Sequence, residues 1–172
     1  CIICKESLNK EDIYKLPEKF ANRLICFHLV DNVRGQTLPF SPQEIKESSW
    51  KIEVLERGHS IVRIIVRGHS KVVANGEWLL GENDWTPDYL LDHGMETEIF
   101  GKASYNLDQK KFTEFELVAI GKRYGKTEFN SRKNSPDSSY IGFLFTLAED
   151  RVEDRVAPAF VDIYNVDWMV KP

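Results

Sequence analysis

The sequence is poor in cysteine, has no long hydrophobic run and has no strong excess of either charge. Three cysteines among 172 residues are far too few for a disulfide-stapled secreted scaffold, and an odd number does not make a disulfide framework. No apolar run approaches the about 20 residues that a helix needs to span a bilayer. The net charge of -4 argues against a general nucleic-acid-binding protein, because that class usually carries a basic excess.

What the composition does contain is typical of a globular domain. Hydrophobic residues make up 42% of the chain and charged residues 29%, which excludes the disordered and collagen-like classes. A chain of this length can bury a sizeable core. We therefore expect residues 1–172 to form a single domain, in which residues 1–22 are either a helical N-terminal extension or the boundary of a fragment.

The chain begins with Cys1 instead of Met, which indicates a processed chain or a fragment. A mature bacterial lipoprotein would begin with a lipidated cysteine, and a processed N-terminus would place the protein in the cell envelope or outside the cell. Against a lipid anchor, the segment 8–20 already looks structured and leaves almost no tether. Cys1 and Cys4 also have the spacing of a thiol redox site, but no strand precedes them.

The first third of the chain predicts two short helices and one strand. Apolar residues at near-helical spacing predict a helix over 8–20, which Pro17 would end or kink. The short apolar run 23–30, RLICFHLV, predicts a buried strand. The tetrapeptide 41–44, SPQE, combines a capping box with a proline at the first helical position, so it predicts a short second helix.

The rest of the chain predicts strands. Residues 50–54 alternate between apolar and charged side chains, and the β-branched run 61–66 predicts a central strand. Further strands are predicted at 71–74 and 78–80, at 98–105 and 112–120 as a hairpin, at 141–147 and at 161–170. Alternation along these segments predicts a core made of Trp50, Ile52, Val54, Ile64, Phe115, Leu117, Phe143, Phe145 and Ile163.

Turn signals separate these strands. The repeated tetrapeptide RGHS predicts two similar turns, at 57–60 and at 67–70, and a short helix over 86–94 would be closed by Gly94. Regular βαβ alternation is absent. The pattern therefore favours a mainly β fold, an antiparallel β-sandwich or partly closed β-barrel with two or three short peripheral helices.

A polar segment over 121–139 is predicted to be a long loop and the main candidate binding element. It concentrates basic residues in an acidic chain and interleaves them with aromatic residues. The candidate ligand-binding residues of this loop are Arg123, Tyr124, Lys126 and Arg132. Such a loop would suit an anionic ligand or the acidic face of a partner protein. The alternative is that the loop folds back onto the acidic segment 82–98 and neutralises it.

Two tryptophans extend the list of candidate ligand-binding residues. Trp78 and Trp85 flank the polar residues 81–84, and aromatic rings beside carboxylates and amides form many sugar-binding surfaces. The carboxylates of segment 82–92 could instead perform glycosidase chemistry, which requires two of them across a cleft.

The cysteines and one histidine form a weak candidate metal site. Cys26 and His28 would point to the same face of a strand. Together with Cys1 and Cys4 they would supply three thiolates and an imidazole, a ligand set that suits structural zinc. The alternative is that Cys26 is a small buried hydrophobic residue.

These observations predict a non-enzymatic β-rich module that binds a ligand or a partner protein. One alternative is a hydrolase, directed at glycans, that uses carboxylates of segment 82–92. A second alternative is a thiol or structural zinc protein that uses Cys1, Cys4 and Cys26. The sequence indicates no cofactor and no nucleic-acid partner.

Overall fold

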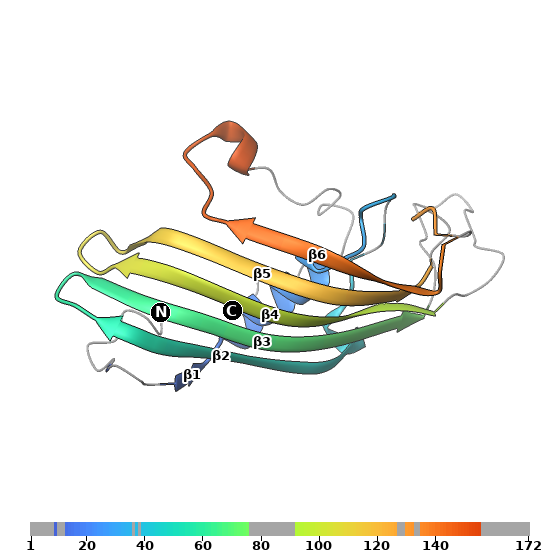
Figure 1. The fold of residues 1–172 in the computed structure, drawn as a ribbon, viewed down its shortest axis with the longest axis horizontal. Helices are drawn as coiled ribbons and strands as arrows, with labels where there is room; N and C mark the ends of the chain where they lie inside the picture. Colours follow the sequence, from blue (N-terminus) through green and yellow to red (C-terminus); the bar gives the residue numbers. More distant parts are fainter. Residues whose placement is uncertain are drawn as a thin grey trace.

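The computed structural model describes residues 9, 13–35, 37, 39–75, 92–126, 130–132 and 135–155. These residues form one antiparallel sheet whose strands follow the chain order from β1 to β6 (Figure 1). The strands are β1 (Ile13–Lys15), β2 (Ile45–Arg57), β3 (Ile61–Asn75), β4 (Asp92–Asn106), β5 (Lys111–Gly125) and β6 (Ser138–Thr146). Strands hold 58% of the described residues and the sheet is not closed. The prediction of a mainly β, antiparallel fold is confirmed.

One face of this sheet is covered and forms the core. Side chains alternate along each strand, so Trp50, Ile52 and Val54 of β2 all point to one face and are buried there. We call this the inner face. The helical turns α1 (Glu18–Arg23) and η1 (Leu24–His28) lie on it (Figure 1). Their buried side chains join the inner-face residues of the strands in one hydrophobic cluster.

The prediction for the segment before β2 was wrong in element type and right in burial. Residues 23–28 are helical instead of extended, with η1 forming a π-helical turn, and a bend follows at 29–30. Pro17 does not end a helix but precedes α1, where its missing N–H leaves no helical hydrogen bond unmade. A short apolar run fits a buried strand and a buried helical turn equally well, which explains the error.

The capping box at 41–44 is confirmed. It starts the short 3₁₀ turn η2 (Pro42–Glu44), and the backbone N–H of its N-cap Ser41 donates to the Glu44 carboxylate at 2.7 Å. The turn ends at once because β2 begins at Ile45. A further 3₁₀ turn, η3 (Val152–Arg155), follows β6. No described helix is long and apolar enough to cross a membrane.

The turn predicted at Gly68 and the helix end predicted at Gly94 were both wrong, for the same reason. Gly68 lies inside β3 opposite Trp50, where an added Cβ would stand 2.8 Å from the indole ring. Gly94 lies inside β4 and does not close a helix. There an added Cβ would collide with the Val72 carbonyl and the Tyr124 hydroxyl. Both glycines are required by close packing and not by a turn.

Two of the predicted connections between strands are turns, and the third is shorter than predicted. The turn at 106–111 is confirmed between β4 and β5, and the first RGHS segment, 57–60, does lead into a turn. The segment 121–139 is not one long loop. β5 runs to Gly125 and β6 starts at Ser138, which leaves only 126–137 as the connection.

The predicted core is largely confirmed among the described residues. Five of its members are buried, namely Trp50, Ile52, Val54, Ile64 and Leu117. Phe115, Phe143 and Phe145 are half-buried and pack against that core. Ile163, the strand over 161–170, the second half of the hairpin at 78–80 and residues 86–91 of the predicted helix lie outside the described residues.

Candidate functional site

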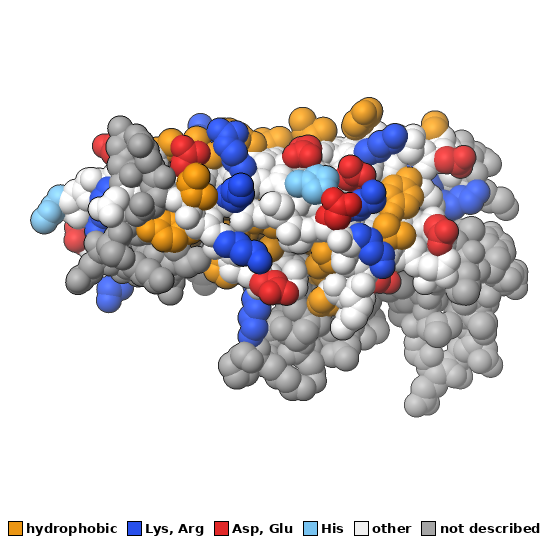
Figure 2. All heavy atoms as spheres, turned by 90° about the horizontal axis from the view of Figure 1, so that it is seen from below, with side chains coloured by type: hydrophobic (Ala, Val, Ile, Leu, Met, Phe, Trp, Pro, Cys, Tyr) orange, Lys and Arg blue, Asp and Glu red, His pale blue; other side chains and the backbone are white. Residues whose placement is uncertain are grey.

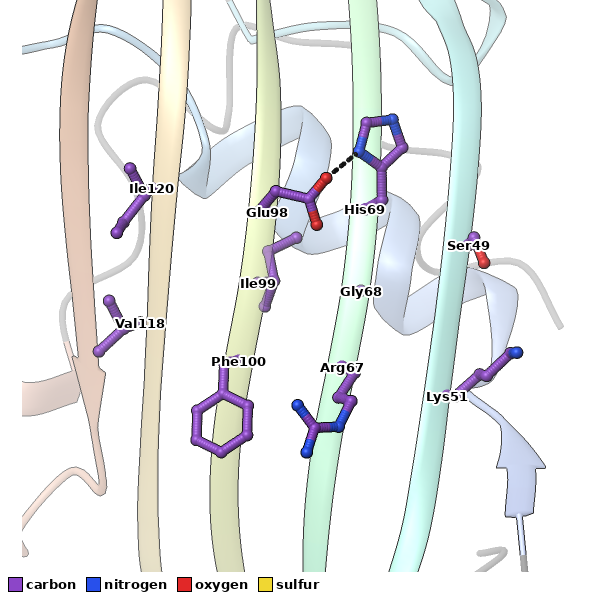
Figure 3. A pocket seen from close by; sticks show the side chains of 10 residues that line it. All are labelled: Ser49, Lys51, Arg67, Gly68, His69, Glu98, Ile99, Phe100, Val118 and Ile120. Carbon is purple, nitrogen blue, oxygen red and sulfur yellow. Dashed lines mark hydrogen bonds and ion pairs between the residues drawn. The ribbon is translucent and has the colours of Figure 1, made fainter.

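A groove crosses the outer face of the sheet, the face opposite the core. It spans four strands, from β2 to β5, has a volume of about 650 Å³ and is open to solvent. Figure 3 shows polar side chains from β2 and β3 and the Glu98 carboxylate of β4 on one side, and apolar side chains of β4 and β5, such as Phe100 and Val118, on the other. Its lining residues are Ser49, Lys51, Arg67, Gly68, His69, Glu98, Ile99, Phe100, Val118 and Ile120.

Strand register assembles this groove from two rows of side chains. Residues opposite each other in an antiparallel pair point to the same face. One row runs through Lys51, Arg67, Phe100 and Val118. The neighbouring row runs through Ser49, His69, Glu98 and Ile120.

The polar half of the groove is centred on His69. Its Nδ1 lies 2.9 Å from a carboxylate oxygen of Glu98, as Figure 3 shows, and its Nε2 lies 3.5 Å from a carboxylate oxygen of Glu47. Two carboxylates therefore hold the imidazole ring from opposite sides. A doubly protonated ring would donate to both.

Two cations stand beside this histidine without an acidic partner. The Arg67 guanidinium lies 4.9 Å from the centre of the Phe100 ring, a cation–π contact. Neither Arg67 nor Lys51 forms an ion pair with any acid in the part of the chain that the structure describes. The groove therefore presents positive charge that the described residues do not neutralise.

The apolar half of the groove continues into a larger exposed patch. Its members are 38% to 80% exposed, and we call them the outer apolar patch: Phe100, Val118, Ile120, Tyr140 and Leu144. Val118 lies opposite both Phe100 on β4 and Leu144 on β6, so the patch is continuous across three strands. The surface displayed in Figure 2 likewise mixes hydrophobic side chains with acidic and basic ones.

The row Ser49–His69–Glu98 has the residue types of a hydrolytic triad but not the geometry of one. The Nε2 atom of His69 faces Glu47, and no hydrogen bond joins the ring to Ser49. A triad also needs free backbone N–H groups to stabilise an oxyanion. Here Ser49 and His69 lie within continuous strand ladders.

Two of the predicted loop cations, Arg132 and Arg123, are buried and held by the protein itself. Arg132 binds Asp31 through two parallel hydrogen bonds, from Nε at 2.8 Å and from a terminal nitrogen at 2.7 Å. Arg123, only 2% exposed, donates to the Ser139 hydroxyl at 2.7 Å. It also donates to the carbonyls of Gly125 and Pro136 at 2.8 and 2.6 Å.

Arg123 therefore lies on β5 and not in the predicted loop, whereas Arg132 does lie in the connection between β5 and β6 but is buried there. Among the described residues, neither arginine pairs with the acids of 92–98, because their carboxylate partner is Asp31. Burial lowers the pKa of Arg123, and the Arg132 charge lowers it further, while Asp31 acts in the opposite direction. The small cavity beside Asp31 and Arg123 has room for no more than about one water molecule.

The other two residues predicted for the basic loop, Tyr124 and Lys126, are half-buried at the end of β5. Tyr124 is half-buried, and its hydroxyl donates to the Val72 carbonyl at 3.1 Å. Burial raises the pKa of this tyrosine, and the Glu96 and Asp92 charges add to the effect. Lys126 is half-buried just after β5. Anion binding by this segment stays a prediction.

Sequence reasoning missed Asp31 as the centre of this network. The segment 31–37 is tied to Asp31 locally, since the Thr37 hydroxyl donates to the Asp31 carbonyl at 2.7 Å. Its ion pair with Arg132 joins positions 101 residues apart. An Asp-Asn pair after an apolar run is an ordinary loop signal, so the sequence carries no mark of this pairing.

The predicted metal ligands are only partly within the described residues. Cys26 and His28 lie on η1 and not on a strand, and only Cys26 is fully buried. Burial, aided by the Glu44 charge, raises the pKa of the Cys26 thiol to about 12. Cys1 and Cys4 lie outside the described residues. Within those described, no group of three or more potential ligands is placed to hold a metal ion.

The remaining candidate residues are almost all beyond the described ranges. Trp78 and Trp85 lie outside them, as does segment 82–91. Asp92 is described and accepts a hydrogen bond from the Asn75 amide at the edge of the sheet. The glycan-directed hydrolase therefore stays a prediction.

No protein-family model, no curated protein and no solved structure matches this chain.

Proposed function

We propose that this chain is a non-enzymatic β-rich binding module whose partner docks in the groove on the outer face. The observation that supports this is the position of the outer apolar patch directly beside two cations, Arg67 and Lys51, that have no described acidic partner. Contiguous exposed apolar side chains of this kind commonly mark interaction sites.

The chemistry of the groove selects the kind of partner. Covering the Phe100 ring, which is 47% exposed, contributes on the order of 1 kcal/mol, about half of what burying a fully exposed phenylalanine gives. Carboxylates on the partner would pair with Arg67 and Lys51. This pairing would speed association and fix the position of the partner along the groove. The partner is therefore a polypeptide segment that presents apolar and acidic side chains together.

Binding of labelled short peptides by fluorescence anisotropy tests this proposal. One peptide combines Phe, Leu and Asp, a second replaces each Asp by Lys, and a third replaces each Phe and Leu by Ser. We expect only the first to bind and its affinity to fall as salt is raised. Equal binding of the first two peptides would contradict the proposal, as would no binding at all.

Variants locate the peptide on the surface. Phe100→Ser and Arg67→Ser should each weaken binding of the first peptide by about tenfold. The matched control is Val152→Ser, which removes an exposed hydrophobic side chain on η3, away from the groove. Equal losses in all three variants would show that binding is not specific to the groove.

A further inference from the structure

The strand β6 is an edge strand with an unusual lack of protection. It pairs with β5 on one side, and no other described strand pairs with its free edge. Its sequence, SSYIGFLFT, contains no charged residue and no proline. A free edge presents unpaired backbone N–H and C=O groups, and proteins usually block such an edge with charges, prolines or a covering segment.

The opposite side of the sheet shows the usual protection. β2 carries six charged side chains among its 13 residues, and β1 covers part of its length. Among the described residues, one edge of the sheet is therefore guarded against strand addition and the other edge is suited to it. The difference indicates that the β6 edge has a partner.

We propose that the partner is β6 of a second copy of this chain, paired antiparallel about a twofold axis that passes beside Gly142. Such an axis, perpendicular to the sheet, keeps the inner and outer faces of both copies aligned. It places Gly142 opposite Gly142, the midpoint of Ser138–Thr146. All nine residues of each strand then pair, over a length of about 30 Å.

Self-complementarity of β6 is the argument for a second copy. On the outer face, Tyr140 would lie opposite Leu144 of the second copy, and these side chains are 80% and 67% exposed. On the inner face, Ile141 would lie opposite Phe143 of the second copy. Just outside the strand, Asp137 would lie opposite Leu147, so no like charges meet. Aromatic, β-branched and aliphatic pairs of this kind stabilise a ladder.

The geometry at Gly142 permits this approach. An added Cβ at Gly142 would meet nothing within 4 Å, so the outer surface is open there. The dimer would bring the outer apolar patches of both copies together on one face. Because a single strand pair buries little surface, we expect a reversible, concentration-dependent dimer and not a permanent one.

Introducing a charge at Gly142, where a side chain has open space, tests the dimer without disturbing the fold. Gly142→Lys and Gly142→Glu should each weaken dimerisation about fivefold or more, because like charges would face each other across the axis. An equimolar mixture of the two variants should restore a dimer. Sedimentation over about 1 µM to 1 mM measures the dissociation constants, and thermal melting at low concentration verifies that each variant folds like the parent chain.

Gly142→Val and Gln109→Lys complete the experiment. Gly142→Val should strengthen the dimer, since β-branched side chains suit facing positions in a sheet. Gln109→Lys adds the same charge in the exposed turn between β4 and β5 and should leave the dissociation constant unchanged. A monomer at every concentration would overturn the proposal, whether because the chain's own residues 156–172 or another protein's strand takes the edge. A dimer unaffected by both charged variants would overturn it equally.

Discussion

The two faces of the sheet are built from the same strands and have opposite relations to solvent. Leu117 and Val118 are neighbours on β5, yet Leu117 is buried in the core of the inner face and Val118 is exposed in the groove. The inner face therefore holds most of the buried apolar side chains, whereas the outer face carries the groove in which we propose that a partner binds. The charged network of Asp31 belongs with the inner face, because it fastens the covering segment to the end of β5.

The largest difference in stability between variants of the two faces should appear when one carboxylate is removed from each face. Asp31→Ala leaves the Arg132 guanidinium buried without its ion-pair partner, and should lower the free energy of unfolding by about 3–5 kcal/mol. Glu98→Gln on the outer face removes an exposed carboxylate contact with His69 and should change the free energy of unfolding by less than about 1 kcal/mol. Urea denaturation measures both.

A double variant distinguishes the cost of leaving Arg132 unpaired from the loss of the ion pair itself. Replacing Asp31 and Arg132 together by apolar residues removes both members of the pair, so the double variant should lose less stability than Asp31→Ala alone. A single variant as stable as the parent chain would show that the network does not hold the N-terminal segment.

A smaller and more direct comparison uses adjacent positions on β5. Leu117→Ala opens a cavity in the core and should cost about 2–5 kcal/mol, whereas Val118→Ala should cost less than about 1 kcal/mol. The two variants delete similar side chains from one strand, so denaturant melts of the pair isolate the effect of the face. Equal losses would mean that the outer face is also covered in solution.

The alternation that distinguishes these two residues is also what the sequence reveals best. It correctly predicted β2, the hairpin of β4 and β5 and most of the inner-face core. It failed at 23–30, where a short apolar run has no period long enough to separate a strand from a helical turn. It failed again at Gly68. Glycine is required there because Trp50 of the neighbouring strand leaves no room for a side chain, and a contact between strands cannot be recognised in the sequence.

The candidate groove could not be predicted because it depends on register. His69 and Glu98 are 29 positions apart in sequence and meet only because β3 and β4 pair in one particular alignment. Arg123 was misplaced for a related reason. The sequence placed Arg123 in a polar loop, but β5 continues to Gly125. The carbonyls of Gly125 and Pro136 and the Ser139 hydroxyl accept the hydrogen bonds of Arg123 inside the protein.

The smallest predicted effect concerns pH and the cover of the inner face. Burial, with a further contribution from the Arg23 charge, lowers the pKa of His28 below its ordinary 6.5. The unfolded chain therefore takes up this proton more readily than the folded chain. The stability associated with the neutral ring is complete above pH 6.5 and is lost as pH falls through the lowered folded-state pKa.

Replacing His28 isolates that contribution from the general effect of acid. The free energy of unfolding of His28→Gln should decline less steeply than that of the parent chain as pH falls from about 7 to 5. Urea melts at several pH values measure the two slopes. Identical slopes would show that the covering segment does not disfavour a charged ring.

The ion pair of Asp31 and Arg132 has a consequence for the order in which the chain is made. The strands pair with their neighbours in sequence, so each hairpin can close soon after its second strand is synthesised. The N-terminal segment is synthesised first, but the residues that fasten it, Arg132 and Arg123, follow about 100 positions later. A nascent chain must therefore carry the apolar residues of α1 and η1 without their final anchor until β5 and the connection after it have left the ribosome.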